Sequence, residues 1–480
     1  MEVINLSFSQ ISNHVITHLY NNQESHIPYT KDTPLKYHNN VFLNLEKVHS
    51  NVNYSPRALL FDVRNGNGSL NMHEYFENNQ VGDQSFFDGK KPRLKNQYQL
   101  NLDQGIVTNN RDLLNTANTQ FWSDYNKLIY NPRSLTTLDN FEYPNNHKYF
   151  QNLKFNQFQI GEEEFIQSNY DVNQFRYFLE KCDHFQGLQL IVDVDSAWPG
   201  FSHLTIQQII DEFFNDGNKL NLWVYGLMND NNENNIISRI KSVIELSKHA
   251  SLFFPFLPNY NSNLLNLKFD SNSPWHTSSI SALYINGLWD TINQLNPTSM
   301  STIENNLLHG SNRLFVNEIK ISGTSHQNVQ MTDIDINNYL NNDSLNDATQ
   351  SSDEIYLTQN TSGSYYFSQN YIVPDHHEID LPNQGVVNTY KTSNINDITK
   401  VDSFPNILTN TDLYFQFHVT SQYKDTLKQY RKIIKNIRLN NDQHMKIVED
   451  KHELIEDISN IIENYTNGYD ESDEEGDDLW

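Results

Sequence analysis

The chain has 480 residues, enough for two or three packed units with large apolar cores. Its formal net charge is −26 and its pI is near 5.0. An acidic surface repels phosphates, which argues against direct DNA or RNA binding. A negatively charged protein is better suited to basic protein partners. The single cysteine, Cys182, excludes an internal disulfide and a cysteine-based zinc site, and it suits a reducing compartment.

No stretch approaches the roughly 20 apolar residues that a membrane-spanning helix needs. The opening residues, 1–5, lack the basic start and long apolar core of a signal peptide. The first arginine is Arg57, so we expect no arginine-rich mitochondrial presequence. The sequence predicts a cytosolic protein that reaches any organelle through a partner.

Strands and helices alternate through residues 1–258. Glu2–Phe8 has the alternation of a strand, and Gln10–Tyr20 has the period of a helix. The later expected elements are a strand at Ala58–Val63, a helix around Phe175–Leu179, a strand at Gly187–Asp193, a helix at Ser202–Phe214, a strand at Leu220–Tyr225, a helix at Ile236–His249 and a strand at Ser251–Phe256. This alternation predicts βαβ units and a parallel sheet, and therefore an α/β fold class.

A second, α+β unit is expected over residues 259–420. Its predicted elements are a helix at Ser279–Gln294 and strands at Arg313–Ile321 and Leu413–Val419. A polar insertion is expected at about 333–364, because its composition cannot fill a core. Apolar stripes predict C-terminal helices over 421–465, and residues 466–480 read as a disordered acidic tail.

Several short segments are similar to known sequences. Those similar to tubulin are Glu2–His14, Tyr54–Asp62 and Cys182–Gln189; those similar to Misato proteins are Asn101–Gly105, Phe121–Tyr125 and Asn131–Leu135. In these segments and their order the chain resembles the Misato family, the fungal Misato-like mitochondrial inheritance proteins related to tubulin and FtsZ. The resemblance implies a tubulin-like fold: a Rossmann-type nucleotide-binding unit, a smaller α+β unit, C-terminal helices and an acidic tail.

The resemblance also implies a nucleotide pocket, which the sequence keeps only in part. Gln10 and Asn13 match the first phosphate loop of tubulin, although residues 9, 11 and 12 depart from its pattern of glycine, cysteine and glycine. Asp62 is retained. Arg64 stands where tubulins place a glutamate near magnesium, so a cation replaces an oxygen ligand.

The central glycine signature of tubulin is replaced by Asp195–Phe201. Asp195 is expected to put a negative charge at the phosphate position, Trp198 is bulky, and Pro199 lacks an N–H donor. Gly200 is the one glycine that remains. A degenerate pocket is therefore expected, with no catalytic residue, no metal and no cofactor, although weak GTP binding stays open.

Other constellations have plain structural interpretations. Asp375–Glu378 contains adjacent histidines, which point to opposite sides of a strand, so we expect an exposed polar loop rather than a metal site. Cys182 is expected to be a buried core thiol, and Trp122 a core or groove residue. The basic residues of 428–435 either form a solvated helix flank or bind an anionic lipid or acidic partner.

Three functions remain as expectations. The resemblance implies a non-catalytic tubulin-like protein that partitions mitochondria and mitochondrial DNA, located peripherally on the cytosolic side of mitochondria and in the cytoplasm. The alternatives are a divergent GTP-binding, filament-forming GTPase and an assembly factor for tubulin. The expected partners are cytoskeletal or mitochondrial-surface proteins.

Overall fold

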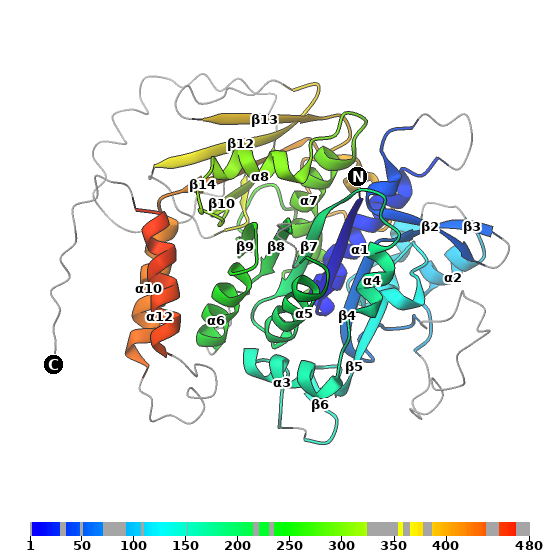
Figure 1. Cartoon of the computed structure of the whole chain (residues 1–480). Coiled ribbons are helices and arrows are strands. Elements are labelled where there is room, and N and C mark those ends of the chain that lie inside the picture. Colours follow the sequence, from blue (N-terminus) through cyan, green and yellow to red (C-terminus); the bar gives the residue numbers. More distant parts are fainter. Residues whose placement is uncertain are drawn as a thin grey trace, which may run out of the picture.

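The computed structural model describes residues 2–28, 35–48, 51–70, 93–106, 110–150, 152–214, 220–229, 235–323, 354–358, 365–377, 386–437 and 451–466. These residues form two large sheets and a separate two-stranded sheet, with helices packed around and between the two large ones (Figure 1). The α/β class expected from the sequence is confirmed. The acidic tail lies outside the described residues.

The larger sheet has seven strands in the spatial order β6-β5-β4-β1-β7-β8-β9. They are β1 (Glu2–Phe8), β4 (Ala58–Arg64), β5 (Leu135–Glu142), β6 (Asn146–His147), β7 (Phe185–Asp193), β8 (Leu222–Leu227) and β9 (Leu252–Phe256). All neighbours pair in parallel except β5 and β6. In this doubly wound order the chain reverses its direction of travel between β1 and β7, so a ligand crevice is expected where these two strands end.

Helices cover the sheet in two groups. They are α1 (Gln10–Ser25) and α7 (Pro274–Asn293), which pack together, and α3 (Phe158–Ser168), α5 (Trp198–Phe213) and α6 (Ile236–Ser247), with α4 (Asn173–Leu179) beside β4. Because helices cover the sheet, β1, β8 and β9 are buried along their whole length. Shorter elements are α2 (Gln97–Asp103), α8 (Met300–Leu308), the hairpin β2 (Leu43–Val48) and β3 (Asn51–Pro56), and the 3₁₀ helices η1 (Asn39–Val41), η2 (Asn110–Leu113), η3 (Trp122–Asp124) and η4 (Pro132–Ser134).

The smaller sheet has the order β11-β10-β14-β12-β13. Its strands are β10 (Glu318–Gly323), β11 (Glu354–Tyr356), β12 (Tyr366–Pro374), β13 (Val387–Thr392) and β14 (Leu413–Thr420), with η6 (Asp397–Lys400) before β14. Helix α7 contacts α1 on one side and β12 and β13 on the other, and it is buried almost throughout. It therefore joins the two units through a shared core.

The C-terminal helices α10 (Tyr423–Asn436) and α12 (Lys451–Asn464) pack against each other and against α6 (Figure 1). Tyr465 is fully buried, and its hydroxyl accepts a hydrogen bond from the Phe315 amide at 2.9 Å. Lys248, the residue that follows α6, pairs with Asp457 at 2.9 Å. The pair of helices is thus part of the folded core. None of the described helices is long and apolar enough to cross a membrane.

Several sequence expectations about local structure were wrong. Helix α7 begins at Pro274 rather than Ser279, and β10 begins at Glu318 rather than Arg313. Helix α5 begins at Trp198 rather than Ser202, because Pro199 is tolerated in a first helical turn, where its missing N–H has no helical partner. The polar insertion at 333–364 is interrupted by β11, whose Ile355 is buried, as is Leu357 just after it. The alternation of these two apolar residues fills the core beside β10. The remainder of that insertion lies outside the described residues.

Candidate functional site

A cavity of about 900 Å³ opens at the carboxyl ends of β7, β8 and β9, beside the first turns of α1 and α7. Its wall includes Ile11, Asp193, Asn229, Asn259, Tyr260 and Thr277. Among the described residues that line it there is no lysine or arginine, and Asp193 is the one acid. The position suits a ligand of a doubly wound fold, but the described part of the lining supplies none of the cations that bind a triphosphate.

The first loop has no glycine, but one of its residues has a backbone conformation that favours glycine. Ser9 has a φ of 119°, a conformation that favours glycine, and its side chain caps α1 by accepting from the Ser12 amide at 3.2 Å. Gln10 donates to the carbonyl of Gln120 at 3.1 Å. Of this loop, Ile11 lines the cavity, whereas the two predicted pocket residues Gln10 and Asn13 do not.

Asn13 of α1 and Asp62 of β4 form a buried, hydrogen-bonded pair. The Asn13 side chain donates to Asp62 Oδ2 at 3.1 Å and accepts from the Ser7 hydroxyl at 2.7 Å. Burial raises the pKa of Asp62 to about 7, against the opposing effects of the Val63 amide, Asn13 and the Trp122 indole. Asp62 is 2% exposed, so no ion can reach it without rearrangement. Trp122 is a core residue with no exposed surface.

Arg64 lies at the end of β4 and is not part of the cavity wall. Its guanidinium donates to the carbonyl of Asp139 at 3.4 Å. The structure therefore does not bring this residue together with Asp193.

Asp195 has a partner that the sequence did not reveal. Its two carboxylate oxygens accept from Arg239 of α6 at 2.6 and 2.8 Å, and Oδ2 also accepts from the Asn229 amide at 2.7 Å. Asp195 and Arg239 are 5% and 8% exposed. The negative charge that the sequence places at Asp195 is therefore neutralised by a bidentate guanidinium.

The backbone N–H groups in the first turn of α5 donate hydrogen bonds within the chain. The Trp198 amide donates to the Ser196 hydroxyl at 3.3 Å, and the amides of Gly200 and Phe201 donate to the Ala197 carbonyl at 3.1 and 3.5 Å. Pro199 has no N–H to offer. A phosphate cradle requires such donors to be free and aimed at the anion, so this helix end does not form one.

Gly200 serves helix packing. A Cβ at Gly200 would lie 1.9 Å from the Phe158 carbonyl oxygen of α3, and a Cβ at Gly161 would lie 1.8 Å from the Ala197 carbonyl oxygen. These reciprocal contacts show that α3 and α5 approach too closely for any side chain. The glycine that remains from the family signature thus allows two helices to pack closely, and it does not line the cavity.

Trp198 also turns away from the cavity. Its ring is 1% exposed and packs against Phe8, Phe155 and Phe201, with centroid distances of 6.0, 5.0 and 5.9 Å. The expectation that its bulk occupies nucleotide space is therefore wrong. Its apolar ring instead fills the core between β1 and α5.

Asp193 is the acid that sequence reasoning missed, although it ends a predicted strand beside the switch point, which is where ligands of this fold bind. Burial and the neighbouring charge of Asp195 raise the pKa of Asp193 to about 7, while the Asp195 amide, Ser196 and Arg239 oppose the rise. No sequence pattern pointed to Arg239, because its partner Asp195 lies 44 residues away in the sequence.

We expect Asp193 to make stability fall as pH rises from about 4 to about 7. Its pKa is raised in the folded chain, so over this range the unfolded chain releases a proton that the folded chain keeps. An Asp193→Asn variant lacks this loss, so its stability relative to the wild type should increase from pH 4 to 7 and then level off. Urea unfolding of both chains at several pH values measures this difference in the free energy of unfolding. The exposed Asp183→Asn is the control, and a pH-independent difference for Asp193→Asn would contradict the assignment.

The prediction for Cys182 is changed by the structure: it is half-buried rather than fully buried, and burial raises the pKa of its thiol to about 11 despite the nearby Arg57. The loop expected at Asp375–Glu378 is present in its described part, where His376 and His377 lie in a turn because β12 ends at Pro374. Glu378 of the same motif lies outside the described residues.

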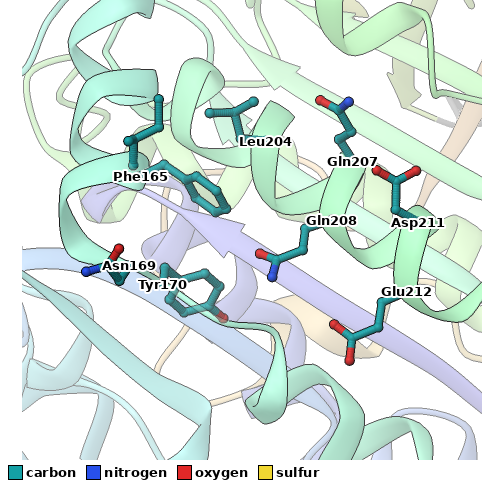
Figure 2. Close-up of a pocket in the computed structure, with 9 residues that line it drawn as sticks. Phe165, Asn169, Tyr170, Leu204, Gln207, Gln208, Asp211 and Glu212 are labelled. Atoms are coloured by element: carbon teal, nitrogen blue, oxygen red, sulfur yellow. The ribbon is translucent and has the colours of Figure 1, made fainter.

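A second, open groove of about 550 Å³ runs between α3 and α5. Figure 2 shows Phe165 and Leu204 toward one end of it and Asp211 and Glu212 toward the other. Arg176 pairs with Glu212. This groove contains none of the predicted pocket residues, so it is distinct from the crevice at the strand ends.

The strand order, the central helix α7 and the modified loops after β1 and β7 define a tubulin-like α/β protein whose phosphate-binding elements are altered. Residues 1–135 match the Misato segment II tubulin-like domain, and residues 112–289 match a tubulin domain. Protein DML1 of Scheffersomyces stipitis is 40% identical and that of Debaryomyces hansenii 41%, each covering 99% of both chains. Protein DML1 of Candida albicans is 36% identical with the same coverage. The chain therefore belongs to the Misato (DML1) family.

Proposed function

We propose that this chain is a non-catalytic tubulin-like scaffold that acts in the partitioning of mitochondria and the inheritance of mitochondrial DNA. The role in partitioning rests on the family resemblance. The non-catalytic character rests on one observation: the first-turn amides of α5 are bonded within the chain, so they are not available to a phosphate.

Two further features support the absence of GTP hydrolysis. Phosphoryl transfer is driven by cations and donors positioned around the transferred group. The cavity wall contributes no basic side chain from the described residues, and its acid, Asp193, would repel a triphosphate when ionised. Asp62, the acid retained from the tubulin pattern, is buried and accepts a hydrogen bond from Asn13.

A titration with a fluorescent GTP analogue, with and without Mg²⁺, tests this proposal. We expect no saturable binding and no nucleotide-dependent polymer in a sedimentation assay. Saturable binding that requires the triphosphate and Mg²⁺ would overturn the proposal and favour the filament-forming GTPase. Binding of guanosine and GTP with equal affinity would show a nucleoside cavity without phosphate recognition, which supports the scaffold.

For the cellular role we infer a peripheral association with the cytosolic face of mitochondria, through protein partners. The charge of −26 makes any effect on mitochondrial DNA indirect, since nucleic-acid binding needs cationic surface. In a fractionation experiment the protein should sediment with mitochondria, be digested by added protease and be released by alkaline carbonate. Protection from protease in intact mitochondria would contradict this location.

The tubulin-assembly alternative needs a truncation that spares the fold. Removing residues 421–480 would delete the buried Tyr465 and the helices that pack on α6, so loss of binding would be uninformative. Removing 467–480 leaves every described residue in place. Tubulin that co-purifies with the intact chain but not with this shorter one would favour the assembly factor.

A further inference from the structure

Two neighbouring histidines in the turn after β12 both reach one carboxylate. His377 Nε2 lies 2.8 Å from Asp412 Oδ2, and His376 Nε2 lies 3.5 Å from Asp412 Oδ1. One ligand atom from each of the three residues can be chosen so that all lie within 4.8 Å of one another. Two imidazoles and a carboxylate converge here from segments 35 residues apart.

The sheet brings these segments together. β12 and β14 pair antiparallel with Ile372 opposite Phe415, so the turn that follows β12 lies beside the residue that precedes β14. The turn is held by the Asp375 amide, which donates to the Thr392 carbonyl at 3.0 Å, and by the His377 amide, which donates to the Pro374 carbonyl at 3.0 Å. Both histidine side chains therefore start from a defined backbone.

The carboxylate is oriented by amide side chains. Asn396 donates from Nδ2 to Asp412 Oδ1 at 3.2 Å, and its own Oδ1 accepts from the Leu413 amide at 3.2 Å. The Asp412 amide in turn donates to Asn410 Oδ1 at 2.9 Å. Outer hydrogen bonds of this kind orient metal ligands and are worth about 10–100-fold in metal affinity.

We propose that His376, His377 and Asp412 form a binding site for a divalent transition-metal ion of the zinc class. Imidazole nitrogens with a carboxylate are the ligands that zinc takes at three-residue sites, whereas calcium and magnesium prefer oxygen alone. A tetrahedral zinc ion with bonds of about 2.0–2.1 Å places its ligand atoms about 3.3 Å apart. The nitrogens of His376 and His377 lie 3.5 and 2.8 Å from different oxygens of Asp412, so both imidazoles are close enough to this carboxylate for one ion to contact all three side chains.

The site is reachable and leaves a coordination position open. The side chains of His376, His377 and Asp412 are 64%, 21% and 30% exposed, so an ion can enter without unfolding. Three protein ligands leave a fourth position for water or for a group from a partner. Because the ion links the turn after β12 to the segment before β14, binding should also stabilise the fold by mass action.

Isothermal titration of the untagged full-length chain with ZnCl₂ tests the site, and CoCl₂ provides an absorption spectrum that reports nitrogen and oxygen ligation. We expect one ion per wild-type chain, with a rise in melting temperature. The double variant His376→Ala/His377→Ala and the single variant Asp412→Asn should weaken binding at least tenfold. Asn396→Ala should weaken it about 10–100-fold while leaving the metal-free melting temperature close to that of the wild type.

The control is His184→Ala, which removes an exposed histidine on another part of the chain and should bind like the wild type. Unchanged zinc affinity in the double variant would overturn the proposal and assign the ion to other histidines. Absence of one-to-one binding in the wild type would overturn it too, leaving His377 and Asp412 as a hydrogen-bonded pair only. Neither outcome depends on whether the chain binds GTP.

Discussion

Replacing Arg239 by alanine is expected to destabilise the fold by about 3–5 kcal/mol. The substitution leaves the carboxylate of Asp195 buried without its cation, because the guanidinium supplies two of the hydrogen bonds that this carboxylate accepts. It also removes the hydrogen bond from Arg239 to the Asn229 carbonyl at 2.6 Å. Chemical denaturation near neutral pH, followed by circular dichroism, measures the change.

The matched control for Arg239 is Arg176→Ala. Arg176 also pairs with an acid, Glu212, but the two side chains are 46% and 34% exposed, so the loss should be about 0–1 kcal/mol. A double variant, Asp195→Leu with Arg239→Leu, should recover much of the stability, because it buries no uncompensated charge. An equal loss of stability in Arg239→Ala and Arg176→Ala would show that burial does not increase the contribution of the Asp195–Arg239 ion pair to stability.

Replacing Trp198 by alanine is expected to cost about 3–5 kcal/mol and to leave GTP affinity unchanged. The indole packs against Phe8, Phe155 and Phe201, so its removal opens a cavity in the core rather than space in the crevice. Denaturation and the fluorescent GTP titration are made on the same preparation. The two measurements separate a packing role from a blocking role.

The control for Trp198 is Tyr149→Ala, an aromatic residue that is 72% exposed and whose loss should stay within about 0.5 kcal/mol. A Trp198→Ala chain that keeps its stability and gains affinity for GTP would contradict the packing role. In that case the indole would be a plug in the nucleotide site, as the sequence alone had indicated.

These two substitutions bear on how a tubulin-like fold is maintained when its glycine signature is replaced. In this chain the segment that replaces the glycine signature is used three times for structure: Asp195 ties the loop to α6, Trp198 fills the core, and Gly200 lets α3 approach α5. Each interaction stabilises the fold independently of a ligand. The altered residues are therefore better explained by packing than by simple decay of a pocket.

Local patterns in the sequence determined the element types and the class of fold. The alternation of Glu2–Phe8, the apolar run Gly187–Asp193 and the helical period of Ile236–His249 each depend on neighbouring residues, so the sequence predicted them correctly. The resemblance of short segments then identified the family. Strands with weaker patterns, such as β5 and β13, were missed, because their burial pattern is uneven.

Only the tertiary structure decided what the candidate residues do. Asp195 meets Arg239 across 44 residues, Asn13 meets Asp62 across 49, and His377 meets Asp412 across 35. The direction of a side chain depends on where its element starts and what packs on it: beginning α5 at Trp198 turned the indole into the core, and ending β12 at Pro374 put two histidines in one turn. Periodicity carries no information about such pairs, because they form only when distant segments are folded together.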